Sequence, residues 1–290
     1  MKRLFFLLSA LLLAMPALQA SGVEDVTDLR SEESSTAQAG LRAGASLQYS
    51  PVRHLQLDLS EEVRLRDNFT RFDASYTALE ISYKALPYLR FGLGYEFQLL
   101  YKDGKKSTNY EFFWQMRHRA LANVTGSYKY MRWNFSLREQ YQATFRTDLD
   151  EEGLLEKANP KMVLRSRFKV TYSFFSKPFK PYASVEMYNP LNHSSFVDDM
   201  FGSDLTVTRT GDANPGKTFR ELMRPSWIDK MQYRLGVEWR LDAHSTLEFF
   251  YLFEHTFDKD VDVKKDGARV LVSDDRYYNH ALGVFYQYRF

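Results

Sequence analysis

Apolar side chains recur at every second position along most of this chain, and this period constrains the fold more than any other feature. Successive side chains of a β-strand point to opposite faces, so the period predicts strands with one apolar and one polar face. A helix would repeat its apolar residues at spacings of three and four, which these segments do not do. The sequence therefore predicts an all-β fold. The alternating segments are 37–50, 55–66, 89–101, 110–130, 133–146, 162–174, 183–187, 231–241, 247–254 and 281–290.

One segment, 72–85, departs from the regular alternation. Its apolar phase switches near Ala78 and Leu79, which predicts a β-bulge there.

The first twenty residues have the composition of a secretory signal. Lys2 and Arg3 precede an apolar run that ends at Leu13, and a stretch of small residues ends at Ala20. The run is shorter than the ~20 residues that a membrane-spanning helix needs. We expect a signal peptide over 1–20 and a single mature domain over 21–290. The sequence has no cysteine, so disulfides and an N-terminal lipid anchor are excluded.

The last strand carries a second signal of export. Alternating apolar and aromatic residues run to a terminal Phe290, and Tyr286 and Tyr288 share its face. This ending resembles the closing strand of bacterial outer-membrane barrels. The resemblance implies that Tyr286, Tyr288 and Phe290 form an assembly signal for the barrel assembly machinery, and that the other partner is outer-membrane lipid.

Composition agrees with an outer-membrane barrel. The mean hydropathy of −0.45 resembles that of a soluble protein, but barrel strands show lipid only every second residue. The aromatic content of 16% suits membrane interfaces, and the net charge of +2 argues against nucleic-acid binding.

Loop lengths alternate between short and long, which is typical of barrels with short periplasmic turns and long outer loops. The longer connections are 102–107, 147–161, 190–229 and 258–276. Bacterial barrels keep an even number of strands. We therefore predict an antiparallel transmembrane barrel of twelve strands, within a range of ten to twelve, with a first strand in 22–35. The long loop 189–229 is compatible with either a constriction of the lumen or an outer contact surface.

Several short blocks resemble an uncharacterised family of bacterial outer-membrane β-barrels defined only as a domain of unknown function (2490). The resemblance implies location in the outer membrane and a barrel fold, and it carries over no catalytic residue and no cofactor. The blocks are 62–66, 117–119, 136–141, 165–168 and 180–186.

The polar face of the strands would line the lumen, and it carries both signs of charge. Arginine pairs well with carboxylates, and a barrel of about twelve strands leaves a narrow lumen. Two interpretations follow: a structural barrel stapled by ion pairs, or a narrow passive channel for small polar or anionic solutes. A surface adhesion or scaffolding role competes with both. The predicted lumen charge network comprises Arg64, Arg66, Arg90, Glu96, Arg117, Arg119, Arg138, Arg165, Arg167, Glu186, Arg234, Glu238, Arg240 and Glu248.

Other functions receive less support. Asp258, Asp260 and Asp262 alternate like calcium ligands, but the EF-hand pattern would need glycine at Val263 and glutamate at Arg269, so we predict no metal site. A lipid-hydrolysing barrel would need a serine nucleophile beside a histidine on the lipid face. Polar residues in that phase are His118, Glu139, His255 and His280. No serine stands out beside them, so we predict no enzyme and no catalytic residue. A soluble periplasmic β-sandwich is the remaining alternative, in which the same apolar faces would form a closed core.

Overall fold

The computed structural model describes residues 26, 28–106, 109–147, 149, 151–175, 177–200, 206, 216–223, 228–264 and 267–290. The predicted signal peptide lies outside these residues. The strands are β1 Asp28–Val52, β2 Leu55–Arg66, β3 Arg71–Leu86, β4 Leu89–Lys106, β5 Asn109–Tyr130, β6 Trp133–Arg146, β7 Lys161–Tyr172, β8 Phe179–Pro190, β9 Lys230–Arg240, β10 Ser245–Val263 and β11 Arg269–Arg289. The helices are α2 Glu151–Glu156, α3 Ser195–Met200 and α4 Phe219–Leu222. None of the helices in the described ranges is long and apolar enough to cross a membrane.

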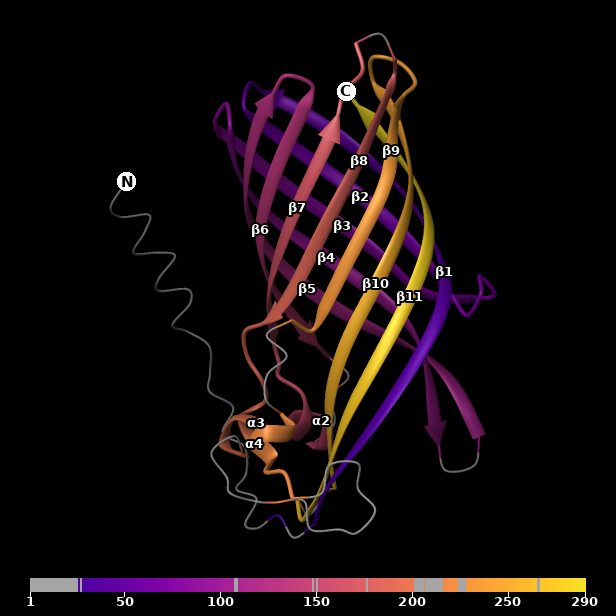
Figure 1. Cartoon of the computed structure of the whole chain (residues 1–290), viewed down its shortest axis with the longest axis vertical. Coiled ribbons are helices and arrows are strands. Elements are labelled where there is room, and N and C mark those ends of the chain that lie inside the picture. Colours follow the sequence, from indigo (N-terminus) through magenta and orange to yellow (C-terminus); the bar gives the residue numbers. More distant parts are fainter. Residues whose placement is uncertain are drawn as a thin grey trace, which may run out of the picture.

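The strands form one closed barrel in which each pairs with its neighbour in sequence (Figure 1). The all-β prediction is confirmed. Eleven strands are present in the described part of the chain, which lies within the expected range and one below the best estimate of twelve. The expected separate first strand does not exist among the described residues, because 28–35 are the beginning of β1.

The prediction of a purely antiparallel barrel is wrong at one strand pair, where the barrel closes. All sequential neighbours pair antiparallel, but β1 and β11 pair in parallel over Asp28 to Gln48. An odd number of alternating strands makes the first and last run in the same direction, so their closure must be parallel. The start of β1 therefore lies at the end of the barrel opposite to the end of β11.

The bulge lies elsewhere than predicted. The β2–β3 register shifts between Arg64 and Leu65, which leaves Asp73 of β3 as the extra residue, and the β3–β4 register shifts again at Ala85. Between these points the odd positions of β3 face outward, as the exposure of Leu79 and Ile81 shows.

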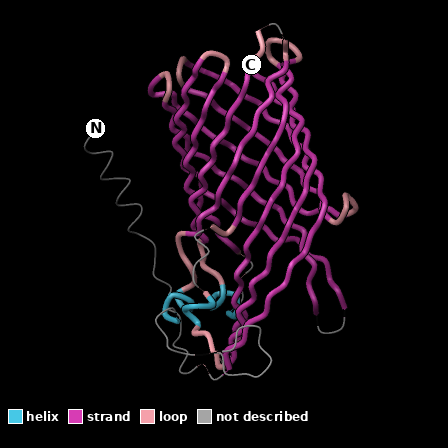
Figure 2. The backbone as a smooth tube through the Cα atoms, in the orientation of Figure 1, coloured by secondary structure: helices cyan, strands magenta, loops and turns pink. Residues whose placement is uncertain are grey.

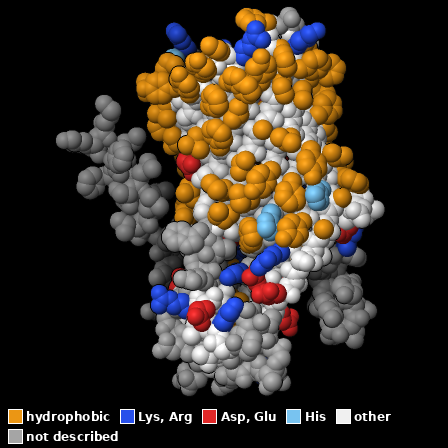
Figure 3. Space-filling view, viewed as in Figure 1, with side chains coloured by type: hydrophobic (Ala, Val, Ile, Leu, Met, Phe, Trp, Pro, Cys, Tyr) orange, Lys and Arg blue, Asp and Glu red, His pale blue; other side chains and the backbone are white. Residues whose placement is uncertain are grey.

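The outer surface of the barrel is apolar. Phe91, Leu137 and Trp239, on three different strands, are 45%, 50% and 38% exposed. Figure 3 shows this apolar surface covering the visible side of the barrel, with charged side chains gathered at its two ends. The same residues would be enclosed in a sandwich core, so the closed barrel excludes the β-sandwich alternative.

Several strands extend beyond the rest at the end that carries the long loops. β1, β10 and β11 have 25, 19 and 21 residues, and the helices lie beside their extended ends (Figures 1 and 2). The helices were not predicted. We call this arrangement the cap, and its apolar core is formed by Leu29, Phe196, Val197, Met200, Phe219, Leu222, Met223, Val261, Val263, Val270 and Val272. Part of the loop 189–229 thus packs on the extended strands.

Candidate functional site in the barrel lumen

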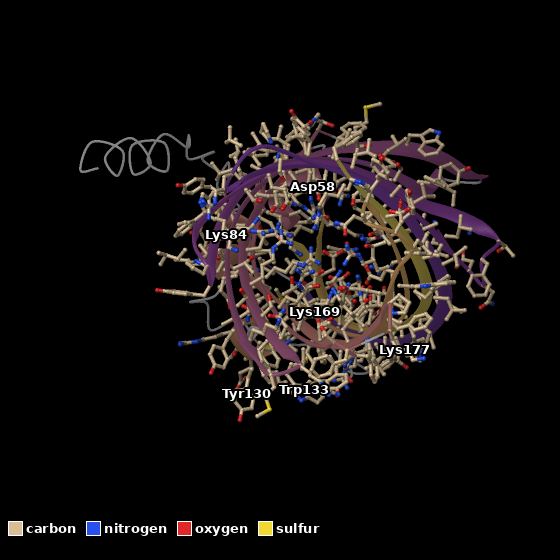
Figure 4. All side chains as sticks on the ribbon, turned by 90° about the horizontal axis from the view of Figure 1, so that it is seen from above. Asp58, Lys84, Tyr130, Trp133, Lys169 and Lys177 are labelled. Carbon is tan, nitrogen blue, oxygen red and sulfur yellow. The ribbon has the colours of Figure 1, made fainter. Side chains whose placement is uncertain are left out.

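The inside of the barrel is lined by polar and charged side chains. Viewed along the barrel, Asp58 and Lys169 lie inside the ring of strands, whereas Tyr130 and Trp133 lie outside it (Figure 4). Alternation along each strand produces this division, because every inward side chain is followed by an outward one.

The most buried charges meet near the middle of the barrel. Arg42 of β1 donates to Glu254 of β10 at 3.1 Å, and each side chain is only 10% exposed. Glu254 also accepts a hydrogen bond from Gln232 and lies 3.7 Å from the Lys230 ammonium. Asn279 of β11 donates to its other oxygen at 3.3 Å. One carboxylate therefore joins four strands, β1, β9, β10 and β11.

Two further ion pairs complete this layer. Arg165 of β7 donates to both oxygens of Glu186 on β8, at 2.5 and 2.8 Å. Arg64 donates to Glu62 at 2.6 Å along β2. Bidentate, charge-assisted bonds of this kind fix side-chain geometry strongly. We call the set the waist network, and it comprises Arg42, Glu62, Arg64, Arg165, Glu186, Lys230, Gln232 and Glu254.

The remaining predicted network residues form smaller groups or stay at the ends. Arg119 pairs with Glu96 at 2.8 Å, and Arg234 lies 3.9 Å from Glu248. Five more contact residues outside the predicted set: Arg138 with Glu80 at 3.0 Å, Glu238 with Lys169 at 2.7 Å, Arg66 with Asp73 at 3.8 Å, Arg117 with Gln115 at 3.0 Å and Arg240 with the Asp242 carbonyl at 3.1 Å. Arg167 borders a lumen cavity. Arg90 is exposed at the short-turn end of β4.

Two cavities occupy the lumen on either side of the waist network. One, of about 590 Å³, lies toward the short turns and is bordered by Asp58, Glu80 and Arg138. The other, of about 500 Å³, lies toward the long loops and is bordered by Arg66, Asp73 and Tyr277. Along β2, Gln56 to Ser60 border the first and Arg64 to Arg66 border the second. The two cavities therefore lie toward opposite ends of the lumen, and four members of the waist network, Arg42, Arg64, Lys230 and Glu254, border the loop-side cavity.

Sequence reasoning missed part of the lumen. Lys230 and Gln232 continue the inward phase of Arg234, but Lys230 precedes the alternating segment 231–241, and Gln232 carries no charge that would mark it as part of a charge network. An inward apolar patch was also missed. It consists of Tyr182, Phe250, Leu252 and Ala281, with Phe285 against it. The signal for it was glycine: Gly236 and Gly283 are register partners of Phe250 on the two neighbouring strands.

The polar residues of the outer face are occupied by neighbouring side chains. His118 and His280 bind the hydroxyls of Tyr95 and Tyr251, each at 2.6 Å, and Glu139 accepts from Ser166 at 2.5 Å. His255 stacks against Tyr278, with ring centres 4.5 Å apart, and contacts the tilted ring of Phe257. These contacts assemble no serine with a histidine. Within the described ranges, no group of three histidine or acidic side chains is placed to hold a metal ion.

Comparison with known proteins places the chain in a family. A solved structure titled "NanC porin structure in rhombohedral crystal form" is 13% identical, with a TM-score of 0.40, and the match covers 74% of this chain and 85% of the other. None of the curated proteins compared with the chain matches it significantly. Residues 41–203, more than half of the chain, match the family described as "Protein of unknown function (DUF2490)". The chain therefore belongs to the DUF2490 family.

Proposed function

We propose that this protein is an integral outer-membrane barrel whose lumen is a narrow passive channel for small polar and anionic solutes. The observation that carries the proposal is the pair of lumen cavities separated by the waist network, inside a barrel whose outer surface is apolar. An apolar belt around a closed barrel is what a bilayer requires, because no strand edge is left unpaired in lipid.

The waist network would set the size of the passage. Its ion pairs join neighbouring strands, as Arg165 and Glu186 do, or reach over an intervening strand, as Arg42 and Glu254 do over β11. Long side chains would thereby be held in the lumen. Small solutes exchange hydrogen bonds with such polar walls, whereas large solutes are excluded by their width. The channel would thus conduct weakly.

Conductance in planar bilayers tests the proposal. We expect the purified protein to give small discrete steps, and the double variant Arg42→Ala/Glu254→Ala to give steps severalfold larger. The double variant removes one charge of each sign, but it also takes the Glu254 carboxylate away from Lys230, so a heat-dependent shift in gel migration must show that the variant is folded. The matched control is Asp28→Ala/Arg30→Ala, which removes an ion pair of 2.7 Å at the start of β1, away from the waist. Absence of steps from both the native protein and the waist variant would show a sealed, structural barrel.

A further inference from the structure

The cavity on the short-turn side carries an excess of positive charge. Its border includes four cationic side chains, Lys84, Arg90, Arg138 and Arg167, but only two carboxylates, Asp58 and Glu80. Glu80 is bound by Arg138, and Asp58 accepts a hydrogen bond from Gln48 at 2.6 Å. The cavity on the loop side is nearly balanced, with four cationic residues and three carboxylates on its border.

Arg167 stands out among these cations. No described side chain makes a hydrogen bond or ion pair with it, although it is half-buried in the lumen. Its register partner on β8 is Glu186, but both oxygens of that carboxylate are held by Arg165. Glu186 therefore acts on the guanidinium of Arg167 only through space, and no carboxylate is hydrogen-bonded to it among the described residues.

The strand on the other side of Arg167 places a second positive charge opposite it. Arg138 of β6 is its direct register partner, so two guanidinium groups stand on adjacent strands. Like charges directly opposite each other across two strands repel. Only Arg138 has a carboxylate partner, through its Nη2 atom.

Unsatisfied donors on the same cavity wall point to a missing acceptor. Arg138 Nε and Asn123 Nδ2 are buried without a hydrogen-bond partner, and both side chains border the cavity. Asn123 lies close to β4 because Gly92 has no side chain, and a Cβ at Gly92 would stand 2.6 Å from Asn123 Nδ2. Buried donors of native proteins are normally paired with protein, water or a ligand.

We infer that this wall, formed by Asn123, Arg138 and Arg167, is a binding site for the oxyanion group of a small solute, a carboxylate or a phosphate. Two arginines and an amide supply several N–H donors to one anion, which is the geometry that recognises such groups. The role of this site rests on the proposed function, because the site would select anions only if the lumen is a channel. Anions would pause there on the short-turn side of the waist.

Calorimetric titration of the folded, detergent-solubilised protein tests the site independently of conduction. The probes are inorganic phosphate and acetate, which distinguish the two sources of the oxyanion. We expect saturable binding of at least one of them by the native protein, and a loss of at least tenfold in affinity in Arg167→Gln. Arg167→Lys keeps the positive charge but not the planar guanidinium, so it should lose less affinity than Arg167→Gln.

The control is Arg53→Gln, which removes the same charge from the exposed β1–β2 turn at the same end of the barrel. It should bind as the native protein does. A heat-dependent shift in gel migration verifies that each variant is folded. Absence of binding by the native protein, or equal affinity in Arg167→Gln, would overturn the site. Conductance without such binding would refute the site but not the channel. Binding without conductance would refute the channel but not the site.

Discussion

At the scale of single residues, the ring of Phe250 fits into the lumen because glycine faces it on both neighbouring strands. Phe250 is 7% exposed, and a Cβ added at Gly283 would overlap its ring. The Arg234 guanidinium lies 4.2 Å above the same ring and limits its movement. We predict that Gly283→Ala lowers the free energy of unfolding by about 1–3 kcal/mol, the usual cost of overpacking a filled site.

Urea unfolding in lipid vesicles measures this cost, and Gly126→Ala is its control because a Cβ there meets nothing within 4 Å. Combining Gly283→Ala with Phe250→Leu should restore part of the loss. Equal stability of the Gly283 and Gly126 variants would mean that the ring of Phe250 moves aside freely.

Asp242 shows how a carboxylate can hold a turn at the end of the barrel. Its Oδ1 atom accepts hydrogen bonds from the backbone N–H groups of His244 and Ser245, both at 2.7 Å. These hydrogen bonds lower the pKa of the Asp242 carboxyl below its ordinary value of 3.8, and the bond from His244 has the largest effect. A lowered folded-state pKa contributes stability that is present above the unfolded value and is lost as pH falls through the folded value.

We therefore predict that amide exchange at His244 and Ser245 accelerates as pH falls below 3.8, relative to the intrinsic rates. Hydrogen exchange followed by NMR in micelles measures it. The variant Asp242→Asn cannot titrate, so its protection at these amides should show no such step. A step of the same size in this variant would assign the effect to another group.

At the scale of elements, the cap is a small apolar core outside the barrel. Phe219 of α4 is fully buried among residues of α3, β10 and β11. We predict that Phe219→Ala destabilises the cap by about 3–5 kcal/mol, the cost typical of a large core truncation. Hydrogen exchange should rise in 195–200 and 219–222 while the barrel strands stay protected. Leu191→Ala, at a half-exposed position of the same loop, should leave both regions unchanged.

The strand faces could be read from the sequence wherever a strand separates an apolar outside from a polar inside. The first part of β1 could not, because Arg30, Glu32 and Ser34 lie beyond the apolar belt. There Leu29 is the apolar residue that packs in the cap core, and the buried Ser31 in the same phase is polar, so no apolar alternation marks the strand. The helices were missed because four to six residues are too few to show a helical period.

The sequence predicts which charged residues line the lumen, but it does not predict which of them form ion pairs with each other. Inward arginines and glutamates follow from strand phase, yet Arg138 and Glu80 lie 58 positions apart on β6 and β3, which are not adjacent strands. Their contact depends on how far the barrel curves between them. Sequence alone gives neither the curvature nor which of two arginines, Arg165 or Arg167, takes Glu186.

At the scale of the whole molecule, the apolar belt decides whether the barrel sits in a bilayer. Leu137, half-exposed on β6, is flanked by the outward Phe135 and Phe168 on the same surface. If this surface meets lipid, an arginine at Leu137 has to enter hydrocarbon, and we predict a loss of about 2–4 kcal/mol in the free energy of unfolding from vesicles. Leu241→Arg, just beyond the end of β9, should cost about 0–1 kcal/mol because it lies near the interface.

This pair of variants separates a membrane barrel from a barrel in water. Leu137 and Leu241 are 50% and 47% exposed, so in water an arginine would cost equally little at either position. Only a surrounding solvent that changes with depth along the barrel can make the two costs differ. Equal costs at Leu137 and Leu241 would thus refute the outer-membrane location, and with it the channel, whatever the lumen contains.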